Sequence, residues 1–323
     1  MCEIAIVGAT GLVGTTALKV FEERGLDDNN FVMFSSKEEV GKIVKFAGRH
    51  YVAQELNKRV IKHEHFDYAL FCTKEDVSKA FIPLFAERGT RVVDCSAYFR
   101  HKYPLIVPEI NFKDAVGNII TNPNCSTAGC VVALNRINKK YGLRNIVYSS
   151  YQAVSGAGSV ALKEMKVTKK ENLTSLPDVI CNNVIPCIGK IEKNLYSTEE
   201  NKMIYETKKI LGDFNINVTA TCVRVPITVG HTISINFTTK KYCTLNKIIN
   251  LLRNSPGLTY VENGLPMPKD VRGKNNVLVG RVRKDLCLKN TFNMVVVVDN
   301  LRKGASQNAV QIIERFINEK HNF

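Results

Sequence analysis

The pattern of hydrophobic and polar positions divides the chain into two parts near residue 144. Before that point, short continuous apolar runs such as IAIVG (4–8), YALFC (68–72) and RVVDCS (91–96) alternate with stretches of helical period. Continuous apolar strands between helices indicate strands buried on both faces, as in a parallel doubly wound sheet. Further strands are expected at 31–34 and 119–122, and helices near 11–24, 77–88 and 126–140.

From about residue 144 the apolar positions form longer strands, expected at 144–154, 216–227, 231–239 and 292–298. They predict a mixed or antiparallel sheet in a second domain, with a helix near 158–170 packed on it. The final segment, 306–320, places Val310, Ile313 and Ile317 on one helical face, and this helix should return to cover the first domain.

The predicted fold class is therefore α/β, with an N-terminal Rossmann-like dinucleotide-binding domain and a second α+β domain that has a mixed sheet. The first domain should span 1–125 together with a C-terminal helix at about 302–323, and the second should span 126–301.

The formal charge of +15 over 323 residues raises the question of nucleic-acid binding. The lysines are scattered through expected helices and loops instead of forming a stripe or a tail, and there is no basic motif interleaved with aromatic residues. We therefore expect no nucleic-acid partner. The charge would instead attract anionic substrates and a phosphate-rich cofactor.

Ten cysteines occur without any CxxC pair, and several lie inside strand-like runs, where thiols behave as small core residues. The sequence predicts a reducing, cytoplasmic compartment and no metal site, because no Cys and His ligands cluster. It has no apolar run near the roughly 20 residues that span a bilayer. The start MCEIAIVG enters a strand-like run directly, so neither a membrane segment nor a leader is expected.

The segment GATGLVG (8–14) follows the first strand and opens a helix. Glycines there let the backbone turn tightly and approach a pyrophosphate, while the helix N-terminus supplies N–H donors. The spacing is GxxGxxG instead of the usual GxGxxG, and an ordinary strand-to-helix turn is the alternative. Its position directly after IAIV favours dinucleotide binding.

A second signal is NPNCST (122–127), which places Cys125 at a junction between a strand and a helix. A helix N-terminus stabilises a thiolate, and its N–H groups can also stabilise an oxyanion. A lone cysteine is commonly structural, but a buried apolar thiol has little to do in this turn. We therefore interpret Cys125 as a nucleophile.

A cysteine nucleophile needs a base, and His231 is the candidate because the other five histidines lie in polar stretches. It begins a strand after PITVG, where Gly230 allows a sharp turn. Arg224 stands inside the apolar run CVRVP, so it is either a buried ion-pair partner or a receptor for a carboxylate. Arg100 closes the turn SAYFR.

With these motifs assembled, the chain resembles the aspartate-β-semialdehyde dehydrogenase family over nearly its full length. The matching segments, in the family's order, are GATGLVG, SAYFR, VPEIN, NPNCST, YQAVSGAG, ETKKIL, TCVRVPITVGH, GRVRKDL and DNLRKGASQNAVQI. N-acetyl-glutamyl-phosphate reductases share the fold and a catalytic cysteine, but their glycine loop and cysteine segment read differently. One departure is the stretch between about 170 and 195, which is short where relatives often carry helices used in subunit contacts.

The resemblance implies a role for each matching residue. The nucleophile would be Cys125 and the acid/base His231. The substrate would be held by Gln152, Arg224 and Glu199, with Arg224 on its α-carboxylate and Glu199 on its α-amino group. The phosphate would be held by Arg100, Asn124 and Lys202. The cofactor would be held by Gly8, Thr10, Gly11, Leu12, Val13, Ser35, Ser36, Lys37, Ser155, Gly156 and Asn300.

The implied reaction is the reduction of L-aspartyl-4-phosphate to L-aspartate-4-semialdehyde, and its phosphorylating reverse, through a thioester on Cys125. The thioester divides one difficult step into two easier ones. The resemblance further implies inorganic phosphate as a partner, a homodimer or dimer of dimers, and a place in the biosynthesis of lysine, threonine, methionine and diaminopimelate.

The loop after the second strand is a further departure from the family's pattern. Relatives commonly carry a Ser-x-Arg-Ser loop that binds the 2′-phosphate of NADP, whereas this chain reads SSKEEVG at 35–41. No acidic residue stands at Ser35 or Ser36 to hold a free ribose hydroxyl, which favours NADP, with Ser36 and Lys37 as phosphate ligands. Glu38 and Glu39 stand where the family has Arg and Ser. We expect NADP with weaker discrimination against NAD, unless both glutamates point to solvent.

Two other functions are compatible with parts of this pattern. Another acyl-phosphate or acyl-CoA reductase, such as a malonyl-CoA reductase, would share the scaffold but would not need Arg224 and Glu199 in one pocket. A non-catalytic nucleotide-sensing protein is disfavoured because Cys125, His231, Arg100 and Arg224 are all present.

Overall fold

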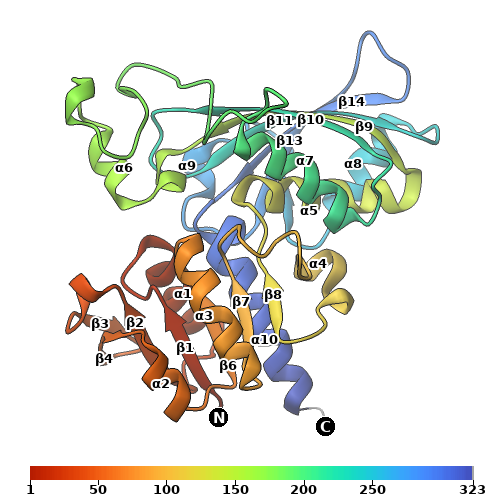
Figure 1. Ribbon diagram of the computed structural model, residues 1–323. Coiled ribbons are helices and arrows are strands. Elements are labelled where there is room, and N and C mark those ends of the chain that lie inside the picture. The colour runs from red at the N-terminus through yellow and green to blue at the C-terminus, as the bar shows by residue number, and fades with distance from the viewer. Residues whose placement is uncertain (322–323) are drawn as a thin grey trace. The chain divides into compact units, whose positions relative to one another are not determined.

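A computed structural model describes residues 1–321 of the chain (Figure 1). The chain forms two compact units, one made of Met1–Pro123 with Ala305–Phe323 and the other of Asn124–Gly304. The chain thus leaves the first unit once and returns to it for its last helix.

The first unit is built on a six-stranded sheet in the order β5-β2-β1-β6-β7-β8, and every pairing in it is parallel. The strands are β1 (Glu3–Val7), β2 (Asn30–Ser35), β5 (Gln54–Glu55), β6 (Tyr68–Phe71), β7 (Arg91–Asp94) and β8 (Ile119–Thr121). A separate antiparallel hairpin joins β3 (Ile43–Phe46) and β4 (Arg49–Val52). The predicted parallel doubly wound sheet is confirmed.

Helices cover both faces of this sheet. They are α1 (Leu12–Glu23), α2 (Lys58–His63), α3 (Glu75–Glu87), α4 (Pro108–Asn111) and α10 (Gln307–His321). Along β1, Ile4 and Ile6 join the core beneath α1 and α10, whereas Ala5 and Val7 join the core beneath α2 and α3. Successive side chains of a strand point to opposite faces, so a strand covered on both sides must be apolar throughout. Val310 of the final helix is buried in the first of these cores, as the pattern predicted.

The second unit contains a six-stranded mixed sheet in the order β10-β9-β11-β14-β13-β12. Its strands are β9 (Leu143–Gln152), β10 (Asn217–Arg224), β11 (His231–Thr239), β12 (Leu258–Tyr260), β13 (Val277–Lys284) and β14 (Thr291–Val298). The central pairings β9–β11 and β11–β14 are antiparallel, whereas β10 runs parallel to β9. The predicted mixed sheet is therefore confirmed.

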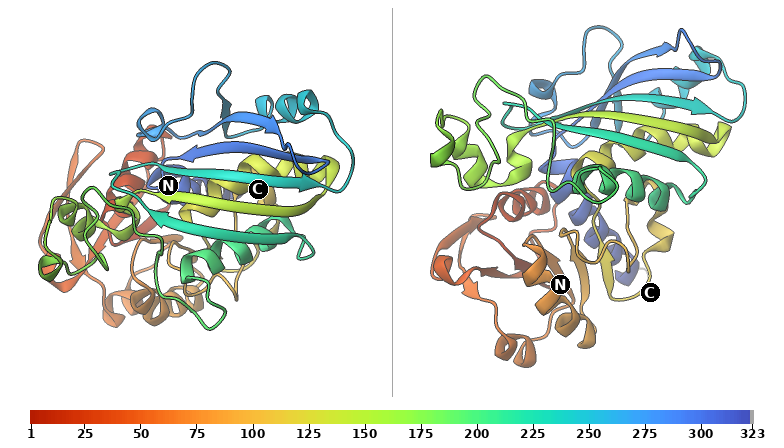
Figure 2. Two further views of the ribbon diagram at one scale, coloured as in Figure 1. Left: turned by 90° about the horizontal axis from the view of Figure 1, so that it is seen from above. Right: turned by 45° about the horizontal axis from the view of Figure 1, so that its top comes forward.

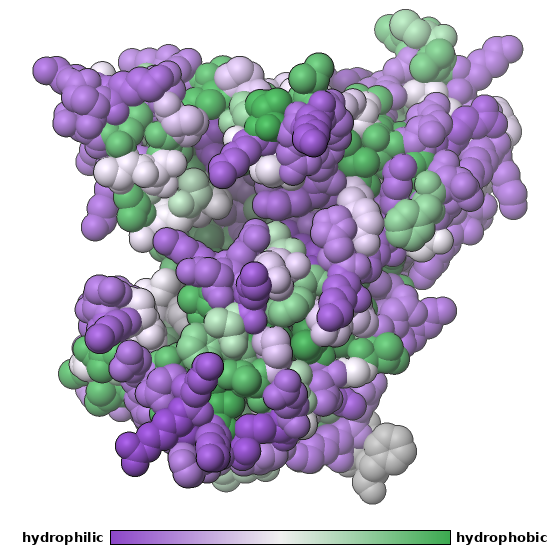
Figure 3. All heavy atoms as spheres, in the orientation of Figure 1, coloured by the Kyte–Doolittle hydropathy of each residue, from purple (hydrophilic) through white to green (hydrophobic). Residues whose placement is uncertain are grey.

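Helices of the second unit pack on one face of its sheet, and Figure 2 (left) shows the strands in front of them. They are α5 (Cys125–Tyr141), α7 (Thr198–Leu211) and α8 (Leu245–Arg253), while α9 (Pro268–Val271) contacts β14 and α6 (Ser159–Glu164) packs against the turn at 154–157. The other face carries partly exposed side chains, including Val147 at 43% and Tyr151 at 45%. Figure 3 shows green, hydrophobic spheres among the purple ones on the surface of this unit.

One predicted helix is wrong in length, because the segment expected over 158–170 is helical only at Ser159–Glu164. The Glu164 carboxylate accepts hydrogen bonds from the backbone N–H groups of Thr174, Ser175 and Leu176 at 2.7–2.9 Å. The chain therefore folds back over the end of the helix. These bonds lower the pKa of Glu164 to about 2, against the effect of desolvation.

Candidate active site

Cys125 is the first residue of α5, a helix of 17 residues. Asn124 caps this helix, since its side-chain oxygen accepts from the N–H groups of Ser126 at 2.9 Å and Thr127 at 3.3 Å. No acidic residue lies in the first turn. The Cys125 thiol therefore sits at the positive end of a long helix dipole, which favours a thiolate.

His231 is the first residue of β11, and its Nε2 lies 3.1 Å from the Sγ of Cys125. The preceding Gly230 has φ +102, and a Cβ there would meet Cβ of Pro268 at 2.9 Å, so glycine is required at this turn. The ring's other nitrogen, Nδ1, accepts from the N–H of Ala153 at 2.9 Å. An acceptor at Nδ1 places the ring hydrogen of neutral His231 on Nε2, facing the sulfur.

Full burial holds the pKa of His231 well below its ordinary value, and the positive charge of Arg224 lowers it further. Protonating Nδ1 would also break the bond from Ala153. Both effects keep the imidazole neutral, so it faces Cys125 as a hydrogen-bond donor.

Arg224 ends β10, beside Gln152 at the end of β9 in the parallel register. Its Nη1 donates to the carbonyl of Ala153 at 2.8 Å, so one backbone residue orients both Arg224 and His231. Burial lowers the pKa of Arg224, and the charge of Glu199 opposes that effect. A cavity of about 280 Å³ opens beside Arg224 and is lined mainly by residues 175–177, 185 and 187–189.

Helix α7 contributes Glu199 and Lys202 to this region. Its N-terminus is fixed by a capping box between Ser197 and Glu200. Glu199 accepts from the side-chain amide of Asn124 at 2.8 Å, and its other oxygen lies 3.9 Å from Nζ of Lys202. The structure therefore brings Glu199, Lys202 and Asn124 together. The side-chain oxygen of Asn124 caps α5, and its side-chain amide donates to Glu199. This structural role was not predicted from the sequence.

The remaining predicted residues of this unit anchor the turn before His231. Asn300 donates to the hydroxyl of Ser155 at 2.9 Å and accepts from the N–H of Gly230 at 3.0 Å. A Cβ on Gly156 would lie 3.0 Å from Nη1 of Arg224, so this position must stay small. Gly304 was not predicted, although a Cβ there would lie only 2.9 Å from Cβ of Cys125.

In the first unit, residues 8–11 form a tight loop at the carboxyl end of β1, and residues 12–14 open helix α1. Gly8 has φ +86, and a Cβ on Gly14 would lie 2.1 Å from the Gly8 carbonyl oxygen, so neither position admits a side chain. Helix α1 begins after Gly11 without a side-chain cap and without an acidic residue in its first turn. The N–H groups of its first turn are therefore available to a phosphate, and the glycine loop lets the backbone approach that phosphate closely. This geometry fits a dinucleotide.

The loop after β2 lies next to this glycine loop. The Thr10 hydroxyl donates to Glu39, whose other carboxylate oxygen pairs with Nζ of Lys42 at 2.7 Å. The hydrogen bond from Lys42 lowers the pKa of Glu39, so the carboxylate is charged. Glu38 is exposed. Only the second of the two glutamates that the sequence singled out thus contacts the glycine loop.

Arg100 belongs to the first unit, in the turn after β7. It donates to the carbonyl of Cys95 at 3.0 Å and is buried. Asp94 accepts from the hydroxyls of Ser78 at 3.0 Å and Ser96 at 2.9 Å. Desolvation raises the pKa of Asp94, with the charge of Arg100 acting against it.

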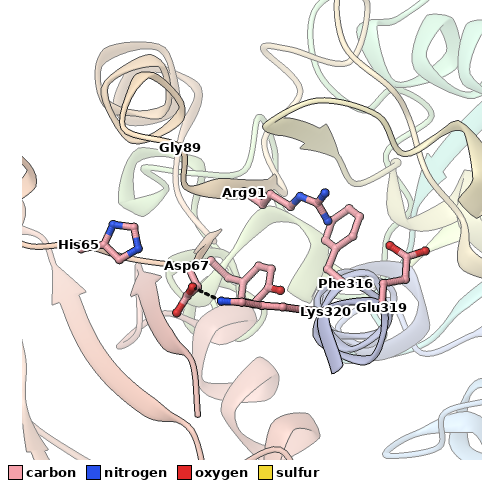
Figure 4. A pocket seen from close by; sticks show the side chains of 8 residues that line it. His65, Asp67, Gly89, Arg91, Phe316, Glu319 and Lys320 are labelled. Carbon is pink, nitrogen blue, oxygen red and sulfur yellow. Dashed lines mark hydrogen bonds and ion pairs between the residues drawn. The ribbon is translucent and has the colours of Figure 1, made fainter. Parts of the chain in front are cut away.

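The pocket in Figure 4 has a volume of about 350 Å³ and lies at the amino ends of β6 and β7. It is lined by Asp67 and Arg91 of that edge, and Lys320 of α10 pairs with Asp67 at 2.7 Å. The glycine loop lies at the opposite, carboxyl edge of the same sheet, where ligands of such sheets bind. We therefore assign this pocket no part in the chemistry.

Within residues 1–321, no group of three or more His, Cys, Asp or Glu side chains could hold a metal ion. No helix in that range is both long enough and apolar enough to cross a membrane.

Comparison with known proteins identifies both units. Residues 3–118 match the NAD binding domain of semialdehyde dehydrogenases, and residues 134–303 match their dimerisation domain. The aspartate-semialdehyde dehydrogenases of Aquifex aeolicus and Bacillus subtilis are each 42% identical to this chain, over 98% and 96% of both sequences respectively. A crystal structure of aspartate semialdehyde dehydrogenase II from Vibrio cholerae, complexed with ASA, is 35% identical, covers 98% of both chains and superposes with a TM-score of 0.93. The chain therefore belongs to the semialdehyde dehydrogenase family and, within it, to the aspartate-semialdehyde dehydrogenases, which are oxidoreductases.

Proposed function

We propose that the protein reduces L-aspartyl-4-phosphate to L-aspartate-4-semialdehyde, and catalyses the phosphorylating reverse, through a thioester on Cys125. The observation that carries this proposal is the 3.1 Å contact between the Cys125 sulfur and Nε2 of His231 at the start of α5. The reaction would serve the biosynthesis of lysine, threonine, methionine and diaminopimelate.

In the reductive direction, the sulfur of Cys125 attacks the acyl carbon, and the bond from that carbon to the phosphate oxygen breaks as phosphate leaves. The thiolate is supported by the N-terminus of α5 and by the charge of Arg224, with which Cys125 interacts electrostatically. When bound, the reduced nicotinamide supplies the hydride that converts the thioester to the aldehyde level. The carbon–sulfur bond then breaks, and Cys125 returns as a thiolate.

His231 supports this sequence as a neutral hydrogen-bond donor. With Nδ1 accepting from Ala153, the Nε2–H is directed at the sulfur and at any oxyanion formed beside it. The resemblance implies that His231 acts as an acid and a base, whereas we propose that it acts as a hydrogen-bond donor. The thiol proton would go to solvent instead of to His231.

Recognition of an amino-acid substrate rests on a buried pair of opposite charges. Arg224 presents a planar guanidinium for an α-carboxylate, and Glu199 presents a carboxylate for an α-ammonium group. The charge of Glu199 acts on the pKa of Arg224 against the effect of burial. Gln152 would orient the thioester, and Lys202, Asn124 and Arg100 would hold the leaving phosphate.

The cofactor proposed is NADP, with weak discrimination against NAD. The residues that would hold it are Gly8, Thr10, Gly11, Leu12, Val13, Ser35, Ser36 and Lys37 of the first unit, and Ser155, Gly156 and Asn300 of the second. Glu39 accounts for the weak discrimination. Its charged carboxylate accepts a hydrogen bond from Thr10 of the glycine loop and would repel a 2′-phosphate. Lys42 offsets part of that charge at 2.7 Å.

A homodimer or dimer of dimers is proposed from the uncovered face of the mixed sheet. Val147 and Tyr151 lie on the same face of β9 and are each more than two-fifths exposed. Apolar side chains on the open face of a sheet mark an interaction surface. Replacing both apolar side chains with charged ones, as in the double variant Val147→Lys with Tyr151→Lys, should lower the mass of the assembly measured by sedimentation.

The function is tested by following aspartate semialdehyde oxidation with purified protein, with and without inorganic phosphate. We expect turnover only with phosphate, and none when coenzyme A replaces it. Equal turnover with coenzyme A would instead indicate an acyl-CoA reductase on the same scaffold.

A further inference from the structure

Helix α7 carries a second buried carboxylate at the start of α5, which the mechanism above does not use. Glu206 is 1% exposed, and one of its carboxylate oxygens accepts from the backbone N–H of Asn124 at 2.6 Å. Asn124 immediately precedes Cys125. A buried charge is retained in a protein only where it is paired or hydrogen-bonded, so this short bond points to a specific partner.

Asn124 is thereby held from two directions by one helix. Glu206 binds its backbone N–H, and Glu199 binds its side-chain amide at 2.8 Å. The two glutamates are seven residues apart on α7, which is two helical turns and places them on one face. The side-chain oxygen of Asn124 caps α5 at Ser126 and Thr127, and its backbone carbonyl accepts from the N–H of Ala128 at 3.0 Å.

This arrangement fixes the residue from which the nucleophile projects. The cap determines where α5 begins, and Cys125 is its first residue. If Asn124 rotated, the cap, the Cys125 sulfur and the contact to Glu199 would all shift together. A misplacement of about 1 Å at a reacting group costs roughly 100-fold in rate.

We propose that Glu206 is a positioning residue that sets the attack geometry of Cys125 through Asn124 and couples it to Glu199. The inference rests on the proposed function for its catalytic consequence, but the orientation of Cys125 can be measured without any substrate.

Glu200 provides a matched control on the same helix. It is also a buried carboxylate, and it accepts backbone N–H groups from Cys222 at 2.9 Å and Ser197 at 2.7 Å. Removing Glu200 therefore disturbs α7 in a comparable way without removing a bond to Asn124. Any effect confined to Glu206 variants is then attributable to Asn124 and Cys125.

The experiment compares Glu206→Ala, Glu206→Gln and Glu200→Ala. For each variant, kcat and KM for aspartate semialdehyde are measured with phosphate, along with Tm and the rate at which iodoacetamide alkylates Cys125. We expect Glu206→Ala to lose roughly 10- to 100-fold in kcat. Glu206→Gln keeps an acceptor oxygen and should recover most of that loss. Glu200→Ala should change Tm as much as Glu206→Ala while keeping most of its kcat.

A second readout separates positioning from simple destabilisation. In an Asn124→Ala background the cap is already lost, so Glu206→Ala should cost much less than it does in the wild type. Full additivity of the two losses would overturn the proposal, as would equal losses in Glu200→Ala and Glu206→Ala. If the wild type does not oxidise aspartate semialdehyde, the proposed function fails. The alkylation rate of Cys125 then still decides the role of Glu206, because an unchanged rate in Glu206→Ala would overturn it.

Discussion

Gly156→Ala is expected to impair substrate binding without unfolding the protein. The added methyl would lie 3.0 Å from Nη1 of Arg224 and 3.4 Å from Cε1 of His231. Packed heavy atoms sit about 3.5–4.0 Å apart, so the guanidinium must move by a few tenths of an ångström. It cannot do so freely, because the same Nη1 donates to the Ala153 carbonyl at 2.8 Å.

The size of the effect follows from the charged hydrogen bond proposed between Arg224 and the substrate carboxylate, which a displaced guanidinium would make poorly. A bond to a charged group contributes about 1.5–3 kcal/mol, and about 1.4 kcal/mol corresponds to a tenfold change in affinity. KM for aspartate semialdehyde should therefore rise roughly 10- to 100-fold. Gly156 does not have a positive φ, so alanine is conformationally allowed and also reduces the entropy of the unfolded chain. The melting temperature should change by only a few degrees, on the order expected for about 1 kcal/mol.

Steady-state kinetics with phosphate and the cofactor in excess would measure KM and kcat. Alkylation by iodoacetamide serves as the control, since this reagent has no carboxylate for Arg224 and should react with Cys125 at nearly the wild-type rate. An unchanged KM would show that Arg224 does not receive the substrate. A large drop in melting temperature would show that the added methyl disturbs the surrounding structure instead of displacing only the guanidinium.

Four further predictions concern single residues. Cys125→Ala should abolish turnover while cofactor binding persists, and mass spectrometry of the wild type with substrate but no phosphate should show the adduct on Cys125 and on no other cysteine. Arg224→Lys keeps the charge but loses the two-pronged contact, so KM should rise about tenfold or more, and a substrate analogue without the α-carboxylate should react poorly with the wild type. Glu39→Gln should raise the ratio of kcat/KM for NADP over NAD, whereas Glu38→Gln should leave it unchanged; equal responses would remove Glu39 from cofactor selection. Glu164 has a pKa lowered from 4.5 to about 2, so its contribution to stability is present above pH 4.5 and is lost as the pH falls toward 2. The difference in melting temperature between the wild type and Glu164→Gln should shrink over that interval.

Local patterns in the sequence were sufficient for the architecture and for proposing Cys125 as the nucleophile. Continuous apolar strands such as Ile4–Val7 indicate burial on both faces, because neighbouring side chains on a strand point to opposite sides. The glycine loop and Cys125 are likewise defined by what stands directly beside them in the chain, a strand before and a helix after. These signals act over a few residues, so they can be read without knowing the tertiary structure.

The contacts on which the proposed chemistry depends join residues far apart in the chain, and only the tertiary structure decided them. The Ala153 N–H sets the tautomer of His231 from 78 residues away, and Glu206 holds Asn124 from 82 residues away. Likewise, the sequence could not show which of Glu38 and Glu39 contacts the glycine loop, because that depends on which side chain the loop directs at Thr10. Hydrophobic periodicity records which face of an element is buried, but it carries no information about which polar atom of a distant element will lie within hydrogen-bond distance.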